Sequence, residues 1–144
     1  MKKISFFLCL SLLLACQSEP KDCRKLIVQT WVLKNHEVNL EVLKSKSAEG
    51  LNSDDIAAIN QTNGWQNIAD SFVATNDTIE FTADGKYRHQ QSETTYSVSE
   101  DCQKLTFEMS PGSQNEFTIH KLTSTNLVLD YIGIKMIYRK MEVK

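Results

Sequence analysis

Hydrophobic and polar residues alternate through most of the second half of the chain. Ile79 and Phe81 alternate with the polar residues Glu80 and Thr82, and Asp84-Gly85 divides this segment from a second alternating one. A period of two is typical of a half-buried β-strand. Asp-Gly favours the tight turn of a hairpin, because glycine tolerates positive φ. We therefore predict a β-hairpin with strands over 78–82 and 86–92.

The same alternation continues to the C-terminus, with turn signals recurring at a spacing of about ten residues, as in an antiparallel meander. Closing such a meander removes its unpaired edges. The sequence therefore predicts a mainly β fold, an antiparallel up-and-down β-barrel of about eight strands. Its later strands are expected over 94–99, 104–109, 116–122, 126–132 and 135–140.

The pattern before the hairpin is mixed. Residues 25–33 are apolar and β-branched, and predict a first strand. Val38–Val42 alternates and predicts a short second strand, although a helix over 36–46 also fits the same residues.

A helical segment is expected between these strands and the hairpin. Ser53 is a candidate N-cap, since acidic residues follow it in the first turn. Trp65, Ile68, Ala69 and Phe72 then recur at helical spacing and share one face. We interpret this face as packing on the domain itself, the alternative being a partner-binding surface.

The N-terminus has the features of an export signal. Basic residues precede a short apolar stretch, too short to span a bilayer, which ends in LLAC at residues 13–16. This ending resembles the bacterial lipobox, a resemblance that implies cleavage of residues 1–15 and lipid attachment at Cys16. Residues 16–24 are then a tether, and residues 25–144 the domain. The resemblance implies a lipid-anchored protein of the cell envelope. We expect the outer membrane, and the sequence does not distinguish its periplasmic face from its surface face.

Composition narrows the range of functions. A length of 144 residues fits one domain, and a net charge of −2 without a basic stripe argues against nucleic acid as a partner. In an exported chain, Cys23 and Cys102 are expected to form a disulfide. The alternative is two separate thiols.

Candidate chemistry is sparse. His36, His89 and His120 lie far apart and have no metal-ligand spacing. The sequence holds no paired nucleophile and base, and no glycine-rich phosphate loop. We therefore predict no catalytic residue, no metal and no cofactor, and we do not expect an enzyme.

The order of several motifs resembles the lipocalin-like domains of bacterial lipoproteins. These motifs are Trp31 in the first strand, IEFTADGKY at 79–87, YSV at 96–98 and LTSTNLVL at 122–129. The resemblance implies that Trp31 packs against Arg139 of the last strand and closes one end of the barrel. The glycine that precedes the tryptophan by two positions in lipocalins is Gln29 here.

Polar residues at the hairpin suggest where a ligand would bind. Tyr87, His89 and Gln91 alternate on one face of the returning strand, and Tyr96 could join them. Facing inward, they would line a mostly apolar pocket; the alternative is that they face solvent. The function expected is a membrane-anchored lipocalin-like lipoprotein that binds a small hydrophobic or amphipathic ligand. The alternative is an envelope protein-interaction or inhibitor module with a filled barrel.

Overall fold

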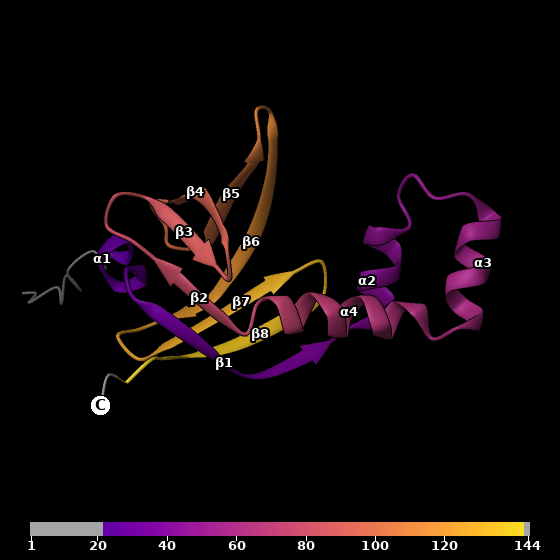
Figure 1. The fold of residues 1–144 in the computed structure, drawn as a ribbon, viewed down its shortest axis with the longest axis horizontal. Helices are drawn as coiled ribbons and strands as arrows, with labels where there is room; N and C mark the ends of the chain where they lie inside the picture. The colour runs from indigo at the N-terminus through magenta and orange to yellow at the C-terminus, as the bar shows by residue number, and fades with distance from the viewer. Residues whose placement is uncertain (1–21, 143–144) are drawn as a thin grey trace, which may run out of the picture.

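The computed structural model describes residues 22–142, and it confirms the predicted antiparallel up-and-down barrel (Figure 1). Each strand pairs with the next, and the last pairs with the first, so the sheet has no unpaired edge. The strands are β1 (Thr30–Val38), β2 (Thr78–Phe81), β3 (Lys86–His89), β4 (Ser92–Val98), β5 (Lys104–Ser110), β6 (Ser113–Leu122), β7 (Asn126–Tyr131) and β8 (Ile134–Lys140).

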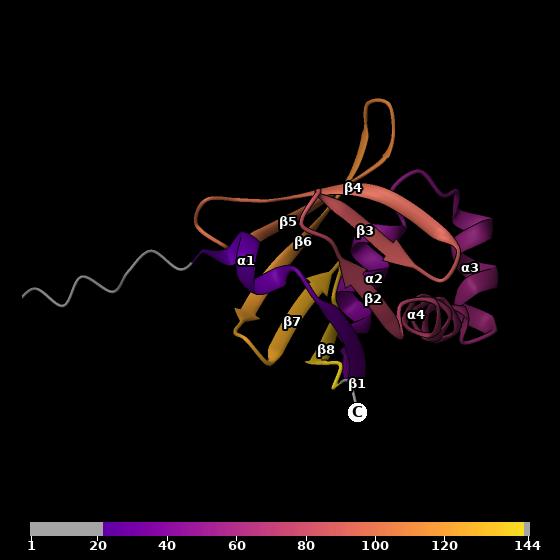
Figure 2. The same ribbon diagram turned by 60° about the vertical axis from the view of Figure 1, so that its left-hand side comes forward.

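Helices lie at both ends of this barrel. They are α1 (Cys23–Ile27), α2 (Leu40–Ser47), α3 (Ser53–Gln61) and α4 (Gly64–Thr75). The last three are inserted between β1 and β2; α3 and α4 form the helical segment predicted there, whereas α2 occupies residues for which a strand was predicted. Figures 1 and 2 show α1 on the side of the barrel opposite α2 and α3. We call the α1 side the closed end and the α4 side the open end. Within residues 22–142, no helix has both the length and the apolar character needed to cross a membrane.

Two strand predictions in the N-terminal half are wrong. Part of the expected first strand, up to Ile27, is helical, and β1 starts only at Thr30. The predicted strand Val38–Val42 is replaced by α2, because the Asn39 side chain accepts a hydrogen bond from the Val42 backbone N–H at 3.2 Å. A five-residue alternation does not distinguish strand from helix, and this N-cap starts a helix.

The inserted helices also differ in detail from the prediction. Asn52, not Ser53, caps α3, and its side chain accepts from two backbone N–H groups. On α4, Trp65 and Ala69 are buried as expected, but Ile68 is 41 % exposed. Val73 is buried instead, so the inward face follows a spacing of four from Trp65.

The hairpin forms where the alternation placed it. Gly85 has a φ of 80°, and the Thr82 hydroxyl accepts from the Lys86 backbone N–H at 3.1 Å, which fixes the turn. The returning strand is shorter than predicted, since β3 ends at His89 and a turn with Gln90 at a φ of 50° follows.

A second turn supports α2 at the open end. Gly133, between β7 and β8, has a φ of 88°, and its backbone oxygen accepts from Asn39 at 2.8 Å. A Cβ at Gly133 would lie 2.9 Å from the Val42 Cβ, closer than real contacts allow. Only glycine fits here, both for the left-handed backbone and for the close approach of α2.

The barrel interior is rich in aromatic rings. Six of them form a chain of ring contacts that crosses the barrel, which we call the aromatic belt: Phe81, Tyr87, Phe107, Phe117, Tyr131 and Phe72. The rings are tilted, edge-to-face or stacked, with neighbouring centroids between 4.5 and 5.4 Å apart. Such contacts add to the stabilisation from apolar burial.

Candidate functional site

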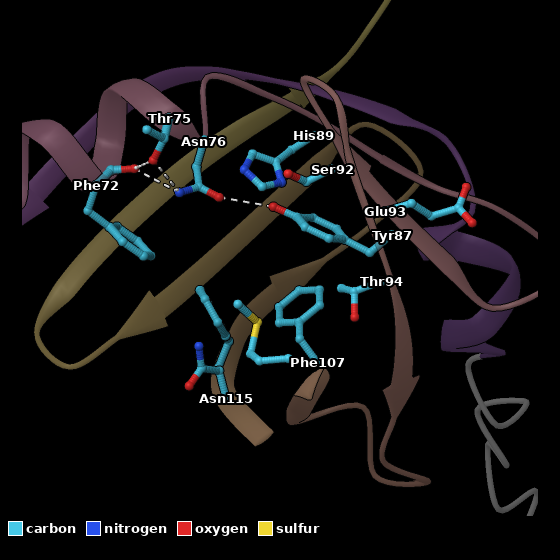
Figure 3. Close-up of a pocket in the computed structure, with 12 residues that line it drawn as sticks. Phe72, Thr75, Asn76, Tyr87, His89, Ser92, Glu93, Thr94, Phe107 and Asn115 are labelled. Atoms are coloured by element: carbon cyan, nitrogen blue, oxygen red, sulfur yellow. Dashed lines mark hydrogen bonds between the residues drawn. The ribbon is translucent and has the colours of Figure 1, made fainter. Parts of the chain in front are cut away.

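A pocket of about 420 Å³ opens beside the C-terminal part of α4 at the open end (Figure 3). Part of α4 covers one side of the opening, and strands β3 to β6 form the other wall. The pocket is lined by Phe72, Thr75, Asn76, Tyr87, His89, Ser92, Glu93, Thr94, Phe107, Met109, Asn115 and Phe117. Its volume lies within the range of about 300–1,000 Å³ that is typical of small-molecule sites.

The apolar part of the pocket belongs to the aromatic belt. Phe107 lies with its centroid 4.5 Å from that of Tyr87 and 4.9 Å from that of Phe117. From α4, Phe72 stacks on Tyr131 at 5.4 Å, so the helix is held to the barrel by a ring contact. Met109 stands at the mouth and is 60 % exposed. The pocket therefore has a rigid aromatic wall with one adaptable apolar side chain at its mouth.

Asn76 connects α4 to the interior through three hydrogen bonds. Its Oδ1 accepts from the Tyr87 hydroxyl at 2.9 Å, and its backbone oxygen accepts from the Tyr138 hydroxyl at 3.0 Å. Its Nδ2 donates to the backbone oxygen of Phe72 at 2.7 Å. Burial raises the pKa of Tyr87 and of Tyr138 well above the ordinary value for a phenol, so both remain neutral donors.

His89 ends β3 at the wall of the pocket. Its ring stacks on that of Tyr87 with centroids 5.5 Å apart, and Figure 3 shows it beside Asn76 and Ser92. Its Nδ1 is shielded from solvent, and none of the described residues forms a hydrogen bond with it.

Charge is directed away from the pocket. Figure 3 shows the Glu93 carboxylate pointing outward, where it accepts from Arg88 Nε at 2.8 Å. This bond raises the pKa of the Arg88 guanidinium. Among the described residues that line the pocket, none is lysine or arginine.

The structure brings together only part of the expected ligand site. Tyr87 and His89 both line the pocket. Gln91 does not, because it is exposed in the turn after β3, where the alternation ends. Tyr96 lies nearer the closed end, and its hydroxyl donates to the Thr82 backbone oxygen at 3.0 Å.

The expected contact between Trp31 and Arg139 is not formed. Trp31 is fully buried, and its indole N–H donates to the Ile27 backbone oxygen at 2.9 Å. Arg139 is exposed and pairs across the sheet with Val32, the outward neighbour of Trp31. Side chains alternate along a strand, so the buried position on β8 falls to Tyr138. Helix α1, not an arginine, covers Trp31 at the closed end.

The predicted disulfide is confirmed. Cys23 and Cys102 are bonded, with their Cα atoms 5.7 Å apart, and the bond joins α1 to the loop between β4 and β5. Cys23 and Arg24, which we placed in the tether, belong to α1. The segment 1–15, expected to be a signal sequence, and Cys16, expected to carry the lipid, lie outside the described residues.

The histidines stand apart in space as well as in sequence. His36 lies 4.0 Å from Asp70 near the helices, and His120 lies 3.9 Å from Asp130 on the barrel wall. Within residues 22–142, no group of three potential metal ligands lies close enough to hold an ion.

Several lining residues were not found by sequence analysis. Phe107 and Phe117 were predicted as strand residues only, and Asn76 was not singled out. Asparagine next to a helix end is a known capping signal, but that signal does not reveal the bond from Asn76 to Tyr87.

Comparison with known proteins adds no further assignment: the chain matches no protein-family model, no curated protein and no solved structure.

Proposed function

We propose that this protein binds a small hydrophobic or amphipathic molecule in the pocket at the open end of its barrel, in the manner of lipocalin-like domains. The observation that carries the proposal is the pocket itself. It combines an apolar aromatic wall with a few fixed polar groups, which is the usual composition of a small-ligand site. The aromatic belt and the Asn76 hydrogen bonds hold this wall in place before any ligand arrives, which lowers the cost of binding.

The test compares two substitutions on adjacent residues of β4. Thr94 lines the pocket, whereas Thr95 is exposed on the outer face. Thr94→Trp therefore fills the pocket, and Thr95→Trp adds the same group outside it. We expect the native protein and Thr95→Trp to carry a co-purified small molecule, or to bind a fluorescent apolar probe, and Thr94→Trp to lose both. Equal binding by all three proteins would refute the proposal.

The proposal includes a lipid anchor at Cys16. Acyl chains stabilise membrane binding by about 0.8 kcal/mol for each buried CH₂ group, so a doubly or triply acylated cysteine needs no membrane-spanning helix. The disulfide at Cys23 holds α1 to the closed end of the barrel. Cys23 is only seven positions after Cys16. The anchor would then attach at the end opposite the pocket, which leaves the mouth open to the aqueous phase. Cys16→Ser is expected to move the protein from the membrane to the soluble fraction of the envelope.

A second candidate function is interaction with another envelope protein through the inserted helices. Helix α3 has no buried side chain, and Ile68 of α4 is 41 % exposed beside it. Capture of a membrane partner that is lost in Ile68→Glu would favour this function. The sequence analysis associated this second function with a filled barrel, and the presence of a pocket argues against such a barrel.

A further inference from the structure

One side chain at the wall of the pocket, that of His89, has a polar ring atom to which the described residues supply no partner. Within residues 22–142, His89 Nδ1 is the one side-chain nitrogen or oxygen that is shielded from solvent without a hydrogen bond. Such an atom loses its bond to water on folding and gains none in return, which is unfavourable. Because Nδ1 is shielded even from water, the ring has to turn before a ligand group in the pocket can reach this atom and remove the cost.

Several polar neighbours of His89 are already engaged in other hydrogen bonds. The Tyr87 hydroxyl donates to Asn76 Oδ1, and Asn76 Nδ2 donates to the Phe72 backbone oxygen. The Thr94 hydroxyl donates to the Glu108 backbone oxygen. Each would have to give up an existing bond in order to turn toward the ring.

The chemistry of imidazole restricts the group that a ligand would offer. In the neutral ring one nitrogen donates and the other accepts, and either nitrogen can take either role. A hydroxyl both donates and accepts, so it can pair with Nδ1 in either tautomer after a small rotation of the ring. A hydrocarbon can do neither. A carboxylate would enter a site with no lysine or arginine among its described lining residues, so its charge would be desolvated without compensation.

The shape of the pocket restricts the ligand body. A volume of about 420 Å³ corresponds to roughly 14 water molecules at about 30 Å³ each. The buried rings of Tyr87, Phe107 and Phe117 bound this space on the inside. The pocket is therefore short and aromatic, and suits a compact planar ring system that can stack on these side chains. A long acyl chain would extend out of the mouth.

We propose that the ligand is a compact, neutral aromatic compound carrying a hydroxyl group, and that His89 selects it by hydrogen-bonding that hydroxyl. This inference rests on the proposed function, since it names the ligand class of the same pocket.

Two probes of nearly equal shape test it: 2-naphthol, which has the hydroxyl, and 2-methylnaphthalene, which has a methyl group in its place. Palmitate serves as a long-chain probe. Their Kd values are measured by titration for the full chain and for His89→Phe and His89→Met, which remove the hydrogen bond with and without an aromatic ring. His89→Gln keeps a polar group of similar reach. His120→Phe is the matched control, because His120 lies outside the pocket.

We expect the ratio of the two naphthalene Kd values to favour 2-naphthol in the native protein and to shift against it by roughly tenfold in His89→Phe and His89→Met. His89→Gln is expected to retain most of the preference, and His120→Phe all of it. An unchanged ratio in the folded apolar variants would overturn the role of His89, and tighter binding of palmitate would overturn the ligand class; in both cases a ligand pocket would remain. Failure of all three probes to bind would overturn the proposed function as well.

Discussion

Reduction of the bond between Cys23 and Cys102 is the perturbation with the largest expected effect on stability. The two cysteines are separated by 79 positions, so the bond closes a loop that includes most of the domain. Loop-closure entropy for this length gives about 4.5 kcal/mol at 25 °C, if the native state is unstrained. A domain of this size has a total stability of about 5–15 kcal/mol, so the loss is a large share of it.

The structure also predicts where the effect begins. Helix α1 has five residues, too few to be stable alone. It is held by the disulfide, by burial of Ile27 and by the hydrogen bond from the Trp31 indole to the Ile27 backbone oxygen. Without the disulfide, α1 is expected to open before the barrel does and to expose that indole N–H.

Urea unfolding with and without reductant measures both effects. With a urea dependence of about 1–3 kcal/mol/M, the midpoint should fall by about 1.5–4.5 M on reduction. Hydrogen exchange should show early loss of protection at the Trp31 indole N–H. The Cys23→Ser/Cys102→Ser variant is the control. Its urea midpoint should equal that of the reduced native protein and should not change when reductant is added. Equal midpoints for oxidised and reduced native protein would refute the reasoning.

Three further predictions follow from the packing. Gly133→Ala should destabilise the fold by about 2 kcal/mol or more, whereas Gly112→Ala, also at positive φ but in open space, should cost about 1 kcal/mol; equal losses by denaturation would contradict the close approach of α2. Stability should fall as pH rises above about 10, by up to about 2.7 kcal/mol per pH unit, because the unfolded chain releases two phenol protons that Tyr87 and Tyr138 retain. Tyr138→Phe should roughly halve that slope, and a flat profile to pH 11.5 would contradict the burial of these hydroxyls. Phe72→Ala should cost about 2 kcal/mol and weaken probe binding, because it removes the ring that holds α4 to the barrel; unchanged hydrogen exchange in α4 would contradict this role.

The barrel could be predicted because its signals are local and repeated. The hairpin around Asp84-Gly85 needs only alternation and a turn that glycine permits. The disulfide followed from the number of cysteines and from the export signal, with no knowledge of geometry. Strand parity carried across the turn from Phe81 allowed inward positions for Tyr87 and His89, but it did not exclude that they face solvent.

The predictions were wrong where one local sequence pattern is compatible with two structures. At Val38–Val42 a five-residue alternation fits strand or helix, and the capping bond from Asn39 favoured the helix. Gln91 left the expected face because a turn interrupts β3 after His89. Arg139 was paired with Trp31 by family resemblance, whereas the register of β1 and β8 places it on the outer face.

The walls of the pocket could not be predicted for a different reason. Phe72, Tyr87 and Phe117 come from three distant segments, and only the closed sheet and the packing of α4 bring them together. The hydrogen bond from Tyr87 to Asn76 depends on where α4 ends, a boundary that sequence patterns locate poorly.

The three histidines allow a direct test of the ligand pocket, since each reports on a different part of the surface. His89 lies in the pocket, His36 near the inserted helices and His120 on the barrel wall. The measurement is an NMR titration of their ring signals and of the Met109 methyl group with 2-naphthol. Our account predicts saturable shifts at His89 and Met109, with His36 and His120 unmoved. Shifts confined to His36, or no saturable shift at His89, would contradict it.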